Sequence, residues 1–130
     1  MDKKSIRPQL NISSVNSSVE EKFQNETLRP IIKLQHSLLI QYFSNLISVQ
    51  KIDFKSLKKE KKSELISEKL VKENPLKDFF KGLVSGQFTP EEFDYYLSNK
   101  NAINKRITQI IEKRLIDSMQ EIETSKWIQS

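Results

Sequence analysis

His36 is the only histidine of the chain and the first candidate for chemistry, because an imidazole can bind a metal ion or transfer a proton near neutral pH. A metal centre needs three or four converging ligands, and no carboxylate stands three or four residues from His36. The chain has no cysteine, which excludes disulfides, thiolate ligands and cysteine nucleophiles. We therefore expect His36 on a helix surface, and we expect no catalytic residue, no metal and no cofactor.

A second candidate is the acidic group Glu91, Glu92 and Asp94, since two neighbouring carboxylates can act as general acid and base. The group directly follows Thr89-Pro90, and a threonine with glutamate three residues later is a capping box. Negative charge in a first helical turn also offsets the helix dipole. The spacing therefore favours a structural role at a helix start.

Basic residues form two clusters on either side of an acidic stretch, within a net charge of +5. Residues 51–72 and 100–114 are basic and residues 73–99 are acidic. Glutamates interleave with the lysines at helical spacing, which favours a solvated helix face. An alternative hypothesis is nucleic-acid binding, because 89–114 outlines a weak helix-turn-helix. Its candidate contacts are Lys55, Lys58, Lys59, Lys62, Asn101, Lys105 and Arg106.

The elements that must position these residues are predicted to be helices. Two glycines and four prolines in 130 residues provide too few turns for an all-β fold. Apolar residues recur at helical spacing, and no apolar run approaches the ~20 residues of a membrane span. We predict an all-α bundle of about five helices. Its single domain covers 17–125, between a flexible arm at 1–16 and a tail at 126–130.

Two long helices are expected to dominate this bundle. The first covers 18–50, begins at a capping box of Ser18 and Glu21, and is kinked or interrupted by Pro30. The last covers 101–124. Both carry broad apolar stripes, formed by Ile31, Leu34, Leu38, Leu39, Tyr42, Phe43, Leu46 and Ile47, and by Ile103, Ile107, Ile110, Ile111, Leu115, Met119 and Ile122.

Shorter helices are expected between the two long ones. Asp53 or Ser56 caps the next helix, and Asn74 caps the one after it, with Pro75 in its first turn. Gly86 is predicted to end that helix in a left-handed conformation. The helix that follows Thr89 is further defined by Phe88 and Phe93, which have the spacing of a hydrophobic staple.

Three segments, at 23–35, 86–92 and 104–106, resemble a family of small bacterial proteins of unknown function that often carry the label glyoxalase. The resemblance covers roughly 23–115 and implies an uncharacterised bacterial helical protein. It directs attention to the polar residues of these segments. They are Gln24, Asn25, Arg29, Gln35, Asn104, Lys105 and Arg106.

The glyoxalase label implies paired βαβββ modules that hold a divalent metal through His, Glu or Gln ligands. This chain offers one histidine and no segment with strand periodicity, so no glyoxalase residue is assigned to it. An enzyme related to the label is a second alternative function, after nucleic-acid binding.

The leading hypothesis is a non-enzymatic interaction or oligomerisation module in the cytoplasm. The expected compartment follows from the lack of cysteine and of a signal-peptide core. We expect self-association as a dimer, with another protein as a further possible partner and no membrane contact. The two apolar stripes are wider than short helices can cover, and a two-fold interface is the commonest way to bury such a surface.

Overall fold

A computed structural model describes Lys3, Arg7 and residues 18–128 of the chain, and these residues form helices and no strand. The elements in order are α1 (Val19–Phe23), a π-helical turn (Gln24–Leu28), α2 (Arg29–Leu34), α3 (His36–Val49), a 3-10 turn (Phe54–Ser56), α4 (Lys59–Lys72), α5 (Asn74–Ser85), α6 (Pro90–Ser98), α7 (Lys100–Asp117) and α8 (Met119–Glu123). The prediction of an all-α bundle is confirmed. No helix among these residues is long and apolar enough to cross a membrane.

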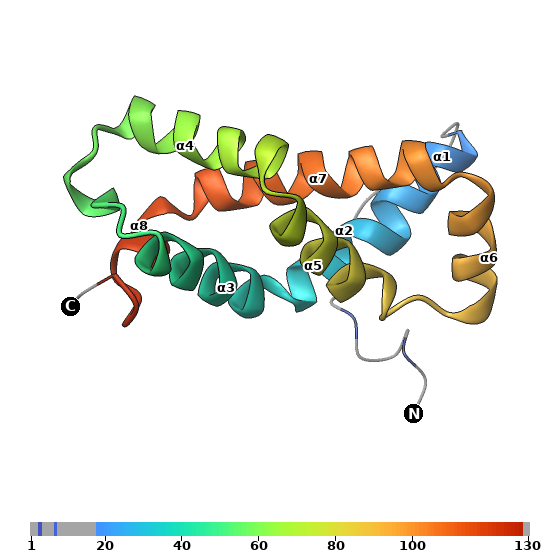
Figure 1. The fold of residues 1–130 in the computed structure, drawn as a ribbon. Helices are drawn as coiled ribbons and strands as arrows, with labels where there is room; N and C mark the ends of the chain where they lie inside the picture. Colours follow the sequence, from blue (N-terminus) through green and yellow to red (C-terminus); the bar gives the residue numbers. More distant parts are fainter. Residues whose placement is uncertain (1–2, 4–6, 8–17, 129–130) are drawn as a thin grey trace.

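Helix α7 is the longest element and lies along the middle of the bundle (Figure 1). The run from α1 to α3 follows it in the same direction, because Glu20 pairs with Arg106 near the start of both and His36 pairs with Glu121 further on. Helix α4 contacts α7 along its length, and α5 contacts both. Helix α6 closes the end at which α7 begins (Figure 1).

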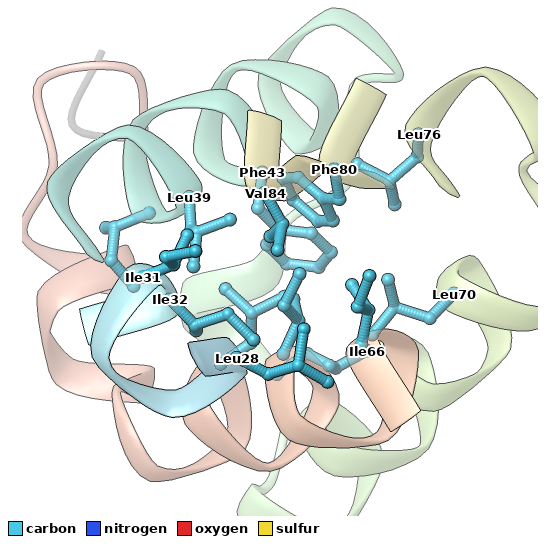
Figure 2. Packing of buried hydrophobic residues seen from close by; sticks show 14 of the residues in the cluster. Leu28, Ile31, Ile32, Leu39, Phe43, Ile66, Leu70, Leu76, Phe80 and Val84 are labelled. Atoms are coloured by element: carbon cyan, nitrogen blue, oxygen red, sulfur yellow. The ribbon is translucent and has the colours of Figure 1, made fainter. Parts of the chain in front are cut away.

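The core lies between these helices and draws on all of the long ones. Phe43, Phe80 and Val84 meet from α3 and α5 in Figure 2, with Ile66 and Leu70 of α4 nearby. The stripe of the last helix is buried at Ile103, Ile107, Ile111, Leu115 and Ile122. Most positions of the two predicted apolar stripes therefore lie in the core of a single chain, but Leu38 of the first stripe is exposed.

The interruption predicted at Pro30 within 18–50 is present as a change of helix type, since the π-helical turn ends at Leu28 and α2 begins at Arg29 with Pro30 in its first turn. Pro30 lies inside a continuous helical run that ends at Leu34, and the break falls at Gln35. Proline has no N–H and its ring clashes with the carbonyl four residues earlier in a regular α-helix. The wide π-helical turn just before it, in which the N–H of Arg29 bonds to the carbonyl of Gln24, lets the helix pass through the proline.

The final helix is also divided, contrary to the prediction of one helix over 101–124. Helix α7 ends at Asp117, Ser118 leaves the helical conformation, and α8 follows from Met119. Beyond α8, Trp127 is half-buried and Ile128 packs against the core, so the described part of the predicted tail contacts the domain. Residues 129–130, and residues 1–16 apart from Lys3 and Arg7, lie outside the described part.

The predicted caps of α4 are wrong. The hydroxyl of Ser56 donates to the carboxylate of Asp53 at 2.7 Å, within a turn that buries Phe54 completely. Burial of this ring holds residues 54–56 in a separate 3-10 turn, and α4 begins only after it. Its cap, Lys58, makes no side-chain hydrogen bond to the helix.

The two boundaries of α5 also differ from the prediction. Asn74 is the first residue of α5 and Glu73 occupies the cap position. Gly86 is right-handed, with φ of −62°, because the chain leaves the helix through tightening right-handed turns. A β-carbon at Gly86 would lie 3.1 Å from the carbonyl oxygen of Gly82, so this glycine serves a close approach instead of a left-handed turn.

Both predicted capping boxes mark the start of a helix in the structure. The Ser18 hydroxyl accepts from the N–H of Glu21 at 3.1 Å, which confirms the start of α1. The box of Thr89 and Glu92 is complete, since Thr89 accepts from the N–H of Glu92 while the Glu92 carboxylate accepts from the N–H of Thr89 at 2.8 Å. The start of α6 is therefore as the sequence predicts.

Candidate functional site

The carboxylate of Glu92 binds the guanidinium of Arg7 in the most buried ion pair of the described residues. Nη1 of Arg7 donates to Oε2 of Glu92 at 2.9 Å and Nη2 donates to Oε1 at 2.8 Å. Only 5% of the Arg7 side chain and 10% of the Glu92 side chain are exposed. This two-point geometry is the strongest form of arginine–carboxylate recognition.

Two local structures fix the orientation of this carboxylate. The capping box holds Oε1 of Glu92 at the N–H of Thr89, at the start of α6. The π-helical turn supplies Thr27, whose hydroxyl donates to Oε2 at 3.1 Å. Each carboxylate oxygen thus accepts one hydrogen bond from its support and one from Arg7. Glu92 is preorganised for a guanidinium.

A turn of backbone carbonyls extends the site beside Glu92. Nη2 of Arg7 also donates to the carbonyl of Gln87. The ammonium of Lys3 donates to the carbonyls of Gly86, at 3.2 Å, and Phe88, at 3.1 Å. Three consecutive carbonyl oxygens therefore face two cations of one N-terminal segment. We call Glu92, Thr27 and the carbonyls of 86–88 the Glu92 site.

The electrostatics of the site favour a charged carboxylate. Burial raises the pKa of Glu92, but the hydrogen bond from Arg7 opposes this effect, as do the N–H of Thr89, the charge of Arg7 and the hydroxyl of Thr27. Together these lower its pKa from the usual 4.5 to about 2. The carboxylate is ionised at every physiological pH and needs a cation to offset its burial.

Sequence reasoning assigned Glu92 only to the helix cap and included Arg7 in a flexible arm. A capping box uses one carboxylate oxygen and leaves the other free, and nothing in the local sequence specifies what approaches that second oxygen. The partners Arg7 and Thr27 stand 85 and 65 residues away along the chain. No periodic or motif signal could have found them.

The segments that carry the family resemblance are linked to one another by contacts with α6. Phe23, next to the π-helical turn, lies 5.6 Å from Phe88 and 4.8 Å from Tyr95 between ring centroids. Tyr96 of α6 donates to the side chain of Asn104 at 2.7 Å. Segments 23–35, 86–92 and 104–106 are thus connected through α6, although the resemblance itself stays a prediction.

The other predicted polar residues do not form one surface. Asn25 accepts a hydrogen bond from Arg29, and Gln35 reaches the carbonyl of Leu83 at the limiting distance of 3.5 Å. Arg106 is exposed and lies 3.5 Å from Glu20.

Two further predicted polar residues, Gln24 and Lys105, are half-buried and exposed, respectively. Glu92, which the sequence analysis assigned to a helix cap, and Thr27, which it did not single out, lie together at the Arg7 guanidinium.

The candidate nucleic-acid contacts have different environments. Lys62 is only 11% exposed, pairs with Glu123 and lies over the ring of Phe54. The carboxylate of Glu123 already offsets the charge of Lys62 within the fold. The remaining candidates are exposed, namely Lys55, Lys58, Lys59, Asn101, Lys105 and Arg106. Nucleic-acid binding stays an alternative prediction that depends on these six residues.

His36 is half-buried between α7 and α8. The guanidinium of Arg114 lies 3.2 Å from Nδ1 of His36, and a carboxylate oxygen of Glu121 lies 2.8 Å from Nε2. Since arginine can only donate, Nδ1 of the neutral ring accepts and Nε2 donates to Glu121. In the described part of the chain, no three histidine, aspartate or glutamate side chains converge as metal ligands.

The described residues thus define an all-α bundle with a preorganised carboxylate that binds arginine. Comparisons of the chain with family models, with curated proteins and with solved structures found no match.

Proposed function

We propose that this protein is a non-enzymatic interaction module whose Glu92 site binds a basic segment through an arginine side chain. The observation that carries the proposal is the two-point ion pair between Arg7 and Glu92. In the described structure the side chains of Lys3 and Arg7 of the same chain occupy the site. A partner would present the same chemistry, an arginine with a lysine four residues before it.

Two features support a recognition role over a purely structural one. The groups that bind Lys3 and Arg7 belong to α6 and the turn before it, and all of them are held in place by local hydrogen bonds of the bundle. The two occupying residues, Lys3 and Arg7, precede the first helix in the sequence and belong to none of the helices that build the site. A preorganised site with a separate occupant is the arrangement expected of peptide recognition.

The proposal can be tested by supplying the segment in trans. The full-length Arg7→Ala variant leaves Glu92 without its guanidinium, and a fluorescein-labelled peptide with the sequence of residues 1–10 is titrated against it. We expect fluorescence anisotropy to report binding. A peptide with alanine in place of Arg7 should bind at least ~10-fold more weakly, since a hydrogen-bonded charge is worth about 1.5–3 kcal/mol.

The matched control is the Arg7→Ala/Glu92→Gln variant, which should lose the difference between the two peptides. Circular dichroism must first show that both variants keep their helices. Equal affinity of the two peptides for the Arg7→Ala chain would refute a role in recognising arginine.

We also propose self-association through an apolar face formed by Leu38 and Tyr42 of α3 with Phe79 of α5. Leu38 is 46% exposed and Phe79 is 40% exposed. The rings of Tyr42 and Phe79 are stacked, with centroids 3.9 Å apart. The stripe of the last helix is buried within the chain and cannot form a dimer interface. The smaller face of Leu38, Tyr42 and Phe79 therefore supports the proposed dimer.

Analytical ultracentrifugation at micromolar concentration tests the dimer. The unmodified chain should shift with concentration from 15.3 kDa towards twice that mass, and Phe79→Glu should hold it at the smaller mass. Phe93→Glu is the matched control, because Phe93 of α6 has the same 40% exposure but lies outside this face. A single species of monomer mass at every concentration would refute the dimer.

A further inference from the structure

We propose that a pocket between α2 and the end of α7 binds a phosphate group through Arg29 and Arg114. The pocket has a volume of about 200 Å³ and is lined by Arg29, Ile110, Lys113, Arg114, Asp117 and Ser118. It is separate from the Glu92 site and from the apolar face of α3 and α5. Its volume is below the ~300 Å³ of sites for drug-sized ligands, which suits a small anionic group.

Arg29 is oriented by a neutral partner. Its Nε donates to the side-chain oxygen of Asn25 at 3.2 Å, one helical turn before it. No carboxylate of the described residues lies within ion-pair distance of Arg29. The bond at Nε leaves the two terminal nitrogens for a ligand. A half-buried guanidinium held in this way can bind a phosphate at two points.

Arg114 of α7 is also oriented by a hydrogen bond. Its Nη1 donates to Nδ1 of His36, and the imidazole is held in turn by Glu121. Arg114 also has no carboxylate of the described residues within ion-pair distance. A chain of three side chains therefore fixes the guanidinium without neutralising it directly. Supporting bonds of this kind position the ligand-binding groups of preorganised sites.

The charges around the pocket favour an anion. Lys113 pairs with Asp117 at 3.3 Å, so these two lining residues offset each other. Arg29 and Arg114 then contribute two positive charges, against the partial negative charge at the end of α7. Ser118, another lining residue, adds a hydroxyl group that can donate a hydrogen bond. Two guanidiniums and a hydroxyl match a doubly charged tetrahedral oxyanion better than a single carboxylate.

Isothermal titration calorimetry of the full chain tests this site, with ionic strength held constant by sodium chloride. Inorganic phosphate and glucose 6-phosphate are the two probes, since a phosphate group can be free or esterified. We expect a dissociation constant of ~1 mM or tighter for at least one of them. Tighter binding of the sugar phosphate would indicate an esterified ligand, and tighter binding of phosphate a free ion.

Variants separate the pocket from the general positive charge of the protein. Arg29→Gln and Arg114→Gln should each weaken binding at least ~10-fold through loss of a charged hydrogen-bond donor. Arg106→Gln removes the same charge from an exposed position of α7 and should leave the affinity within about twofold. Absence of binding to both probes, or an equal loss in the Arg106 variant, would overturn the proposal. Thermal unfolding of each variant checks that the fold is retained.

Discussion

The Glu92→Gln variant should unfold at pH 7 with about 3 kcal/mol less free energy than the unmodified chain. The pKa of Glu92 is about 2 in the folded protein, compared with a usual value of 4.5. A carboxyl group with a lowered folded pKa stabilises the fold fully above its unfolded pKa and loses that contribution as pH falls towards the folded value. The stability gap between variant and unmodified chain should therefore close between about pH 4.5 and pH 2. Urea denaturation at pH 7 and at pH 2.5 measures it.

Three controls separate the ion pair from the helix cap. Thr89→Ala removes the cap hydroxyl and should cost about 1 kcal/mol. Glu91→Gln changes an exposed neighbouring carboxylate and should cost little. Arg7→Ala combined with Glu92→Gln should cost about the same as Glu92→Gln alone, because the two residues act as one pair. Equal losses of stability in the Glu91 and Glu92 variants would contradict a specific contribution of the Glu92–Arg7 ion pair.

Phe80→Ala should destabilise the protein by about 3–5 kcal/mol, the usual cost of deleting a phenyl ring from a core. The ring of Phe80 is 2% exposed and lies beside Phe43 and Val84 in Figure 2. It also meets Tyr42 edge to face, with centroids 5.9 Å apart. Chemical denaturation of the variant, with the helical circular dichroism signal as the readout, measures the loss.

Phe79→Ala is the matched control, since Phe79 is the preceding residue on the same helix. Its ring stacks on Tyr42 but is 40% exposed. Its removal should cost about 0.5–1.5 kcal/mol, the range for one aromatic contact. If both variants lost the same stability, the burial of Phe80 would not explain its contribution to the core.

The sequence by itself determined that the chain is helical and which positions of the last helix are buried. The stripe of the last helix is buried at Ile107, Ile111 and Leu115 because a period near 3.6 residues places these positions on one side of a helix. The capping box of Thr89 and Glu92 could be predicted because its two residues are three apart and need no other part of the chain. Such features depend on local spacing, which a sequence states directly.

Tertiary structure decided the features that depend on distant partners. The π-helical turn before Pro30 and the break at Gln35 have no signal in the local sequence. Arg29 and Arg114 come to line one pocket only because α2 and α7 lie side by side. The second oxygen of Glu92 has no local partner, and Arg7 reaches it from 85 residues away. Local spacing fixes which face of a helix is polar, but only the packed fold brings two such faces within hydrogen-bond distance.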